Sequence, residues 1–263
     1  MTRARHACIG AVLGALVVGS APAARQVVPA PPVVGVFYRG TPVGVPVQDE
    51  LALVRALGFG AVVWPFDDPA RARELARMAD LVGLRVLSPR DAERDGGRSR
   101  IMPVPAGETP ALPARAWLAI AAGARTLLLD AGTPAGAGFQ DGAGRPAPWL
   151  QDAQALARQI DANAELIGRL AQGPSIDVDA GGTRVVLLDG GRAWVLIAAN
   201  PSPAPQAALA RVPNDVPFGP WVSLIDGTDM AMVVRRGYHE YRAALAAGEA
   251  RVYVIDKTPP ATS

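Results

Sequence analysis

The stretch TPALPARAWLAIAAGARTLLLDAGT, residues 109–133, joins a helix to a buried strand. Its small and apolar residues run up to Gly123 and predict a helix, and the segment from Thr126 to Asp130 predicts an apolar strand. A strand of this kind is buried on both faces, as in a parallel sheet that helices cover. Because α/β folds bind their ligands at the carboxyl ends of such strands, Asp130 is a candidate functional residue.

Upstream of this stretch, the chain repeats a strand and a helix at intervals of about 25 residues. Strands are expected at residues 33–38, 61–64 and 84–87. One helix is expected over 48–57, and a second follows Asp68, which can cap it, with Pro69 at its first position. This alternation predicts βαβ units and a parallel sheet.

Two further elements complete the first half of the chain. A short strand is expected over 101–104, and Pro103 confines it to a sheet edge because proline cannot donate to a strand ladder. After the segment 109–133, the spacing of apolar residues predicts one long helix from Trp149 to about Ala171.

Beyond Gly173 the pattern changes to short strands separated by turns that contain Gly, Pro and Asp. The expected strands are 176–179, 184–188, 193–199, 207–212, 221–225, 232–235, 238–245 and 251–255. Such a series is typical of an antiparallel sandwich. We therefore predict an α/β plus β fold, with a parallel βα domain over 33–173 and a small antiparallel β-sandwich domain over 174–257.

The N-terminus has the layout of a secretory signal peptide. A short basic region precedes an apolar run over 7–19 and an A-x-A site at 21–23, so we expect residues 1–23 to be cleaved. A Pro-rich linker over 24–32 and a tail over 258–263 flank the two domains. The expected location is periplasmic or secreted, with no membrane span after cleavage, because a span needs roughly 20 apolar residues.

Charge and metal-ligand content argue against several classes of function. The formal net charge is +2 and the basic residues are scattered, so no nucleic-acid partner is expected. His6 and the single cysteine, Cys8, are lost with the signal peptide, which leaves His239 alone and predicts no metal site. Because the chain has no Gly-rich phosphate loop of the proper spacing, no cofactor is expected.

Four segments carry a resemblance to a known family: DELALVRALGFGAVVWP at 49–65, ARELARMADLVGLRVL at 72–87, RAWLAIAAGARTLLLD at 115–130, and PWLQDAQALARQIDANAELIGRL at 148–170. They resemble parts of the (β/α)-barrel glycoside hydrolases of clan A, such as the β-galactosidase-like families. In order, they match the first helix and second strand, the second helix and third strand, the eighth unit, and the helix after it. The strands beyond residue 173 are similar to the β-domain that commonly trails these barrels, and the resemblance implies a carbohydrate partner.

The chain departs from this family in the middle of the barrel. A complete barrel has eight βα units and about 250 residues, whereas about four or five units fit between Val33 and Gly173. In the resembled families the catalytic glutamates usually lie on the fourth and later strands, and no Asn-Glu or Trp-x-Glu strand end occurs here. We therefore expect an incomplete, TIM-barrel-like domain without its middle strands, and no glutamate can be assigned by resemblance.

Glycoside hydrolysis uses two carboxyl groups, about 5 Å apart for retention and about 6.5–9.5 Å apart for inversion. Asp67 and Asp130 are the candidate catalytic carboxylates because they follow or end expected strands. Asp68 is more simply a helix cap, and the simpler role of Asp130 is to cap the glycine-rich turn after it. The glutamates inside expected helices are interpreted as solvated helix charges; they are Glu50, Glu74 and Glu165.

Four residues at or just past strand ends are candidate substrate-binding residues: Tyr38, Arg39, Trp64 and Phe66. Aromatic rings at this position can stack on sugars, while Arg39 can hold a hydroxyl or a carboxylate. The alternative is that Trp64 and Phe66 cover the rim of the core.

Two hypotheses of function follow. The first is an exported glycoside-hydrolase-like protein that acts on a poly- or oligosaccharide through Asp67 or Asp130 by acid–base chemistry. The second is a non-catalytic carbohydrate-binding or structural envelope protein derived from that fold, which the lack of paired glutamates favours. An incomplete barrel also leaves an open sheet edge, which a loop, the sandwich or another subunit would have to cover, so a homo-oligomer is one of the expected arrangements.

Overall fold

The structure is a computed structural model, and several segments of the chain fall outside the residues that it describes. The described residues are 31–38, 46–65, 68–88, 90, 98–104, 111–131, 145–180 and 182–257. The candidate residues Arg39, Phe66 and Asp67 lie outside them, as do the expected signal peptide and the C-terminal tail. Within the described ranges, no helix has both the length and the apolar character that a membrane crossing requires.

The first half of the chain builds a five-stranded sheet in which every neighbouring pair is parallel. Its strands are β1 (Val33–Phe37), β2 (Ala61–Val63), β3 (Arg85–Leu87), β4 (Ser99–Pro103) and β5 (Thr126–Asp130). The order β3-β2-β1-β5-β4 places the first strand between the second and the last. The wall of a (β/α) barrel has the same neighbour order where its last strand meets its first.

The described parallel strands do not close into a barrel. Among the described residues, β3 and β4 are the two edges of the sheet, and no strand pairs with the outer side of either. The parallel βα sheet and the antiparallel sheets of the prediction are confirmed, whereas the incomplete barrel stays a prediction. The edge position that Pro103 implied for its strand is confirmed.

Helices cover one face of the parallel sheet. They are α1 (Val47–Ala56), α2 (Pro69–Leu81), α4 (Leu112–Ala121), α5 (Pro148–Ala162) and α6 (Ala164–Arg169). The start of α2 forms as the sequence predicts, because Oδ1 of Asp68 accepts hydrogen bonds from the backbone N–H groups of Ala70 and Arg71 at 3.1 and 3.0 Å. Leu75 and Ala79 bury the apolar stripe of this helix.

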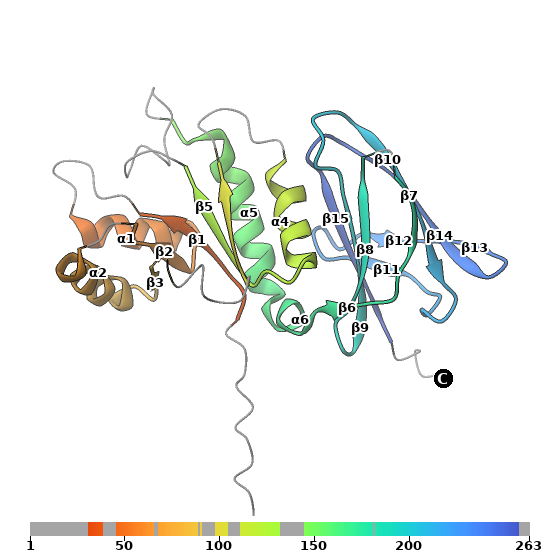
Figure 1. Cartoon of the computed structure of the whole chain (residues 1–263), viewed down its shortest axis with the longest axis horizontal. Helices are drawn as coiled ribbons and strands as arrows, with labels where there is room; N and C mark the ends of the chain where they lie inside the picture. The colour runs from red at the N-terminus through yellow and green to blue at the C-terminus, as the bar shows by residue number, and fades with distance from the viewer. Residues whose placement is uncertain are drawn as a thin grey trace, which may run out of the picture.

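The single long helix expected from Trp149 to Ala171 is wrong, because the helix breaks at Asn163. The Asn163 side chain donates from Nδ2 to the carbonyl oxygen of Gln159 at 2.8 Å, and its backbone N–H donates to the same oxygen at 3.2 Å. Asparagine offers the backbone an alternative to the helical ladder in this way. A second short helix, α6, then turns the chain toward the antiparallel strands (Figure 1).

The second half of the chain forms two antiparallel sheets, of order β13-β14-β10-β7 and β12-β11-β15-β9-β8-β6. The strands are β6 (Ala171–Gln172), β7 (Asp177–Ala180), β8 (Arg184–Asp189), β9 (Ala193–Ala199), β10 (Gln206–Pro213), β11 (Trp221–Ser223), β12 (Asp229–Met230), β13 (Val233–Arg235), β14 (Tyr238–Leu245) and β15 (Ala250–Asp256). The two sheets pack face to face around their own core, which includes Trp221, Tyr241 and Leu196.

The helices and the six-stranded sheet share a second, larger core. On β9, Val195 and Ile197 join the core of the helices, whereas Leu196 and Ala198 join the core of the sandwich. The six-stranded sheet is therefore buried on both faces. The parallel sheet, helices α4 and α5, the six-stranded sheet and the four-stranded sheet follow one another as four layers, whereas α1 and α2 lie beside β2 and β3, away from the sandwich (Figure 1).

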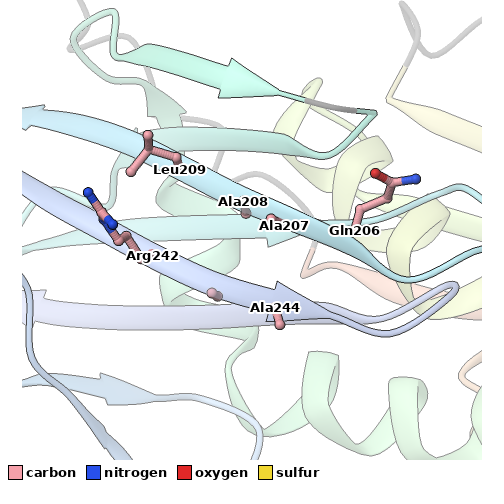
Figure 2. Close-up of a pocket in the computed structure, with 7 residues that line it drawn as sticks. Gln206, Ala207, Ala208, Leu209, Arg242 and Ala244 are labelled. Atoms are coloured by element: carbon pink, nitrogen blue, oxygen red, sulfur yellow. The ribbon is translucent and has the colours of Figure 1, made fainter.

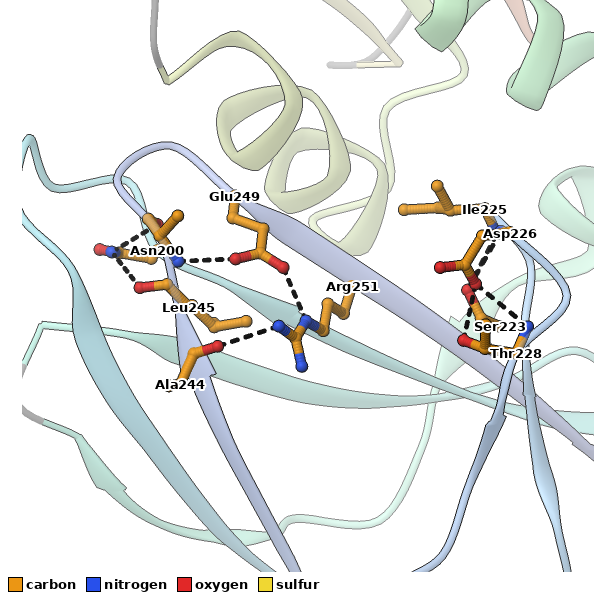
Figure 3. Close-up of polar contacts among 10 residues, drawn as sticks. Asn200, Ser223, Ile225, Asp226, Thr228, Ala244, Leu245, Glu249 and Arg251 are labelled. Atoms are coloured by element: carbon orange, nitrogen blue, oxygen red, sulfur yellow. Dashed lines mark hydrogen bonds and ion pairs between the residues drawn. The ribbon is translucent and has the colours of Figure 1, made fainter.

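A buried asparagine fixes the loop after β9. Asn200 is fully buried, and its Nδ2 donates to the carbonyl oxygens of Ala204 and Ala246 at 2.8 Å each and of Leu245 at 3.3 Å. Beside it, the carboxylate of Glu249 accepts from Nε of Arg251 at 2.6 Å (Figure 3). The bonds from Asn200 to Leu245 and Ala246 tie the loop after β9 to the turn between β14 and β15.

Candidate functional site

Three candidate residues are described, and all three lie at the C-terminal ends of parallel strands. Tyr38 follows β1, Trp64 follows β2, and Asp130 ends β5. The rings of Tyr38 and Trp64 lie 6.2 Å apart between centroids, tilted by 33°. The C-terminal ends of parallel strands lie along the same edge of a sheet, so all three candidate residues lie along one edge of this sheet.

The sheet separates Asp130 from the two aromatic residues. Tyr38 and Trp64 belong to the core on the helix-covered face, whereas Leu128 lies in a separate cluster on the opposite face with Val63. Side chains alternate along a strand, so Asp130 shares the face of Leu128. The structure therefore does not bring the predicted carboxylate and the predicted sugar-stacking rings into one pocket.

Tyr38 and Trp64 are largely buried, with 4% and 8% of their surfaces exposed. Together with Arg71, Glu74 and neighbouring apolar residues they line a pocket of about 160 Å³ between the strand ends and α2. Ligand sites are commonly about 300–1,000 Å³, so this pocket is small for a sugar. Both rings pack in the core on the helix-covered face of the sheet. Their contact with a sugar stays a prediction.

Glu50 is the residue at this edge that the sequence interpretation missed. It lies in α1, is only 5% exposed, and accepts a hydrogen bond at Oε2 from the Tyr38 hydroxyl at 2.9 Å. Burial raises the pKa of the Glu50 carboxyl, while the Tyr38 hydrogen bond acts in the opposite direction. Burial also raises the pKa of the Tyr38 hydroxyl, and the charge of Glu50 adds to this.

The interpretation of Glu50 as a solvated helix charge is therefore wrong. A signal was present in the sequence, because Glu50 shares its helix face with the buried Val54 four residues later. By contrast, Glu74 is exposed, and Glu165 is exposed and forms an ion pair with Arg169, as expected for solvated helix charges.

Asp130 is half-buried and is the single carboxylate that a described strand of the parallel sheet carries at its C-terminal end. Its backbone carbonyl accepts from the N–H of Val104 at 2.8 Å, next to its register partner Pro103 on β4. Asp68 serves as a helix cap, and Asp67 is outside the described residues. The described strand ends of the parallel sheet therefore carry one carboxylate, and the catalytic role expected for Asp130 stays a prediction.

Other groups provide no catalytic cluster within the described residues. No three His, Cys, Asp or Glu side chains there are arranged to hold a metal ion. The buried His239 packs on Phe218 with ring centroids 5.3 Å apart, whereas Glu240 accepts from Nε of Arg242 at 2.7 Å. The two neighbours thus use different partners and do not form an acid–base pair.

A shallow trough of about 670 Å³ marks the outer face of the four-stranded sheet (Figure 2). Small side chains such as Ala207 and Ala244 form its floor, between Leu209 and Arg242. Its described lining holds no acid, so the trough has no group for acid–base chemistry.

No known protein family and no curated protein matches this sequence. Solved structures to which the chain is similar include a glycoside hydrolase family 30 subfamily 8 xylanase from Clostridium acetobutylicum, at a TM-score of 0.36 and 12% identity over 80% of this chain and 59% of the xylanase. A maltogenic α-amylase from Thermotoga neapolitana gives a TM-score of 0.42 and 10% identity over 80% of this chain and 66% of the amylase. A family 27 β-L-arabinopyranosidase from Geobacillus stearothermophilus gives a TM-score of 0.36 and 9% identity over 81% of this chain and 62% of that enzyme. The chain therefore spans less than two thirds of the length of each of these glycoside hydrolases.

Proposed function

We propose that this chain is an exported, glycoside-hydrolase-like protein that binds a poly- or oligosaccharide and does not cleave it. The neighbour order of the parallel sheet supports the barrel-derived part of this proposal, because the first strand sits beside the last. The antiparallel sandwich after it agrees with the layout that the sequence resemblance implies. The expected signal peptide supports export to the periplasm or the medium.

One observation supports the proposal that the protein does not cleave its polysaccharide. Asp130 is the only carboxylate at a described C-terminal strand end of the parallel sheet, and the buried carboxyl of Glu50 is bound to Tyr38 on the helix-covered face. Standard glycoside hydrolysis requires two carboxyl groups on either side of one bond. A single carboxylate can bind a sugar hydroxyl, but it cannot act as both acid and base or nucleophile.

The second candidate function is hydrolysis through Asp130 and Asp67. The position of Asp130 favours it, since catalytic residues of barrel enzymes come from the C-terminal ends of the strands. In that case one carboxyl group protonates the leaving oxygen, and the other activates water or attacks the sugar.

The mature protein should be tested against a panel of neutral and acidic polysaccharides, with binding and release of reducing ends scored separately. Binding without turnover supports the proposal. Turnover that Asp130→Asn abolishes, and that Asp80→Asn on the exposed side of α2 leaves intact, would establish the hydrolase instead. Absence of binding to every polysaccharide would contradict both. Mass spectrometry of the exported protein tests cleavage after Ala23.

A further inference from the structure

A groove of about 830 Å³ runs along the outer edge of β4. It is lined by residues 99–103 of that strand, by Arg115, Leu118 and Ala119 of α4, by Ala122 just after that helix, and by Arg184 of β8. Its volume falls within the range of about 300–1,000 Å³ that is usual for ligand sites. We call this feature the β4 groove. It lies where the parallel sheet, the helix layer and the sandwich meet.

The charged side chains in the described lining of the β4 groove are all arginines: Arg100, Arg115 and Arg184. None of the three forms an ion pair with a carboxylate among the described residues. Two further arginines, Arg98 and Arg125, directly precede β4 and β5, and the pKa of Arg125 is lowered by burial and then by the charge of Arg98. A groove with three arginines and no described acid selects for an anionic ligand.

The groove has an apolar side as well. Leu118 and Ala119 of α4 and Ala122 just after it line the groove together with Met102, a buried residue of β4. Sugar rings carry apolar C–H faces between polar hydroxyls, so an aliphatic surface beside arginines suits a charged sugar better than a fully hydrated phosphate. Guanidinium groups also bind carboxylates through two parallel hydrogen bonds.

The edge of β4 is poorly suited to pairing with an added peptide strand. Pro103 has no N–H to donate, and its carbonyl oxygen already accepts from Nη1 of Arg115 at 3.4 Å. A proline at a sheet edge is one of the devices that prevent strand addition. A ligand in the groove is therefore bound by side chains and not by backbone pairing with β4. This argues against an extended acidic peptide as the ligand.

We infer that the β4 groove binds an anionic polysaccharide whose sugars carry carboxylates. This inference rests on the proposed carbohydrate-binding function and names the class of polysaccharide. The carboxylates pair with Arg100, Arg115 and Arg184, while the sugar rings lie along the aliphatic side of α4. The site differs from the strand-end edge, because it runs along the flank of the sheet.

Binding of polygalacturonate to the full chain, measured by calorimetry or affinity electrophoresis, tests the inference. The double variant Arg100→Glu/Arg184→Glu should weaken binding by at least about tenfold, because each reversal replaces an attraction by a repulsion. Raising NaCl from about 50 to about 300 mM should also weaken it, since salt screens exposed charges. Arg77→Glu on the exposed face of α2 is the matched control and should bind as the parent does. Circular dichroism checks that each variant is folded.

The outcomes separate this inference from the function on which it rests. Unchanged affinity of the folded double variant overturns the groove assignment and leaves carbohydrate binding intact. Binding to neutral amylose or xylan without binding to polygalacturonate also overturns the groove assignment and leaves carbohydrate binding intact. Equal affinity for poly-L-glutamate or single-stranded DNA shows a general polyanion surface and also overturns it. Failure to bind any polysaccharide overturns the proposed function as well.

Discussion

The Tyr38 hydroxyl donates a hydrogen bond to Oε2 of Glu50 at 2.9 Å, and it connects the end of β1 to α1 inside the core. The two residues are twelve positions apart and both are nearly inaccessible to water. A buried carboxylate without a donor is strongly unfavourable. Tyr38→Phe should therefore lower the free energy of unfolding by about 1–3 kcal/mol, measured by urea denaturation at neutral pH. A change below about 0.5 kcal/mol would show that water or another group replaces the hydroxyl.

The same pair predicts a pH dependence of stability. Because burial raises the pKa of Glu50 above its ordinary value of 4.5, the folded state holds this proton more tightly than the unfolded state. The stabilisation is fully present below the unfolded pKa and is lost as pH rises through the folded pKa. Glu50→Gln should therefore stabilise the protein relative to the parent at neutral pH, with a smaller difference near pH 4.5. Thermal unfolding across this range checks it, and a difference that grows on acidification would contradict the sign.

Gly35 at the centre of the parallel sheet should not tolerate a side chain. A Cβ there would lie 2.9 Å from the carbonyl oxygen of Ala61 and 3.1 Å from Cδ2 of Leu128. Gly35→Ala should lower the free energy of unfolding by about 1–3 kcal/mol through overpacking. Gly168→Ala is the matched control, because nothing lies within 4 Å of a Cβ at that position in α6. The control should stabilise the protein by about 0.5–1 kcal/mol.

Asn200 should be among the most sensitive polar residues of the sandwich. Its Nδ2 donates to three carbonyl oxygens, including that of Leu245 (Figure 3), and its Oδ1 accepts from both the N–H and the hydroxyl of Ser202. Asn200→Ala should cost about 2–4 kcal/mol, because several buried groups lose their partner at once. Ser202→Ala removes one donor and should cost about 1 kcal/mol or less. Equal losses in the two variants, measured by urea denaturation, would show that Asn200 is not the centre of the network.

Lys257 anchors the end of β15 through two contacts. Its Nζ donates to Oδ1 of Asp189 at 2.6 Å and lies 4.0 Å from the centroid of the Trp194 ring. A double-mutant cycle of Lys257→Ala and Asp189→Asn should give a coupling energy of about 0.5–1 kcal/mol, because the pair is partly exposed. The Lys257 hydrogen bond, and then the N–H of Gly191, hold the pKa of Asp189 below its ordinary value. The coupling should therefore persist above pH 3.8 and fade as pH drops through the lowered pKa of folded Asp189.

Strands and helices whose ends are marked by turn residues, a capping residue or a proline were predictable from the sequence. The strands 193–199 and 238–245 match β9 and β14 residue for residue, because turns bound each of them on both sides. The cap at Asp68 and the edge position of Pro103 follow from the chemistry of single residues. The two-residue strands β6 and β12 escaped prediction, since they exist only through pairing with partners distant in the sequence or across a turn.

The candidate site was less predictable, for a physical reason. The strand from Thr126 to Asp130 is apolar on both faces, so its sequence carries no alternation that assigns Asp130 to one of them. The same holds for the strands before Tyr38 and Trp64. The burial of Glu50 depends on a hydroxyl that a distant strand supplies, although its spacing from Val54 gave a partial signal.

The double burial of β9 has a consequence for how the chain can be divided. Because Val195 and Ile197 complete the helix core while Leu196 and Ala198 complete the sandwich core, neither half can be removed without exposing an apolar layer of the other. We expect fragments cut near Gly173 to aggregate and the intact chain to unfold in a single cooperative transition. The chain changes from parallel to antiparallel structure at that residue, and we expect the cooperative unit of folding to extend across the change.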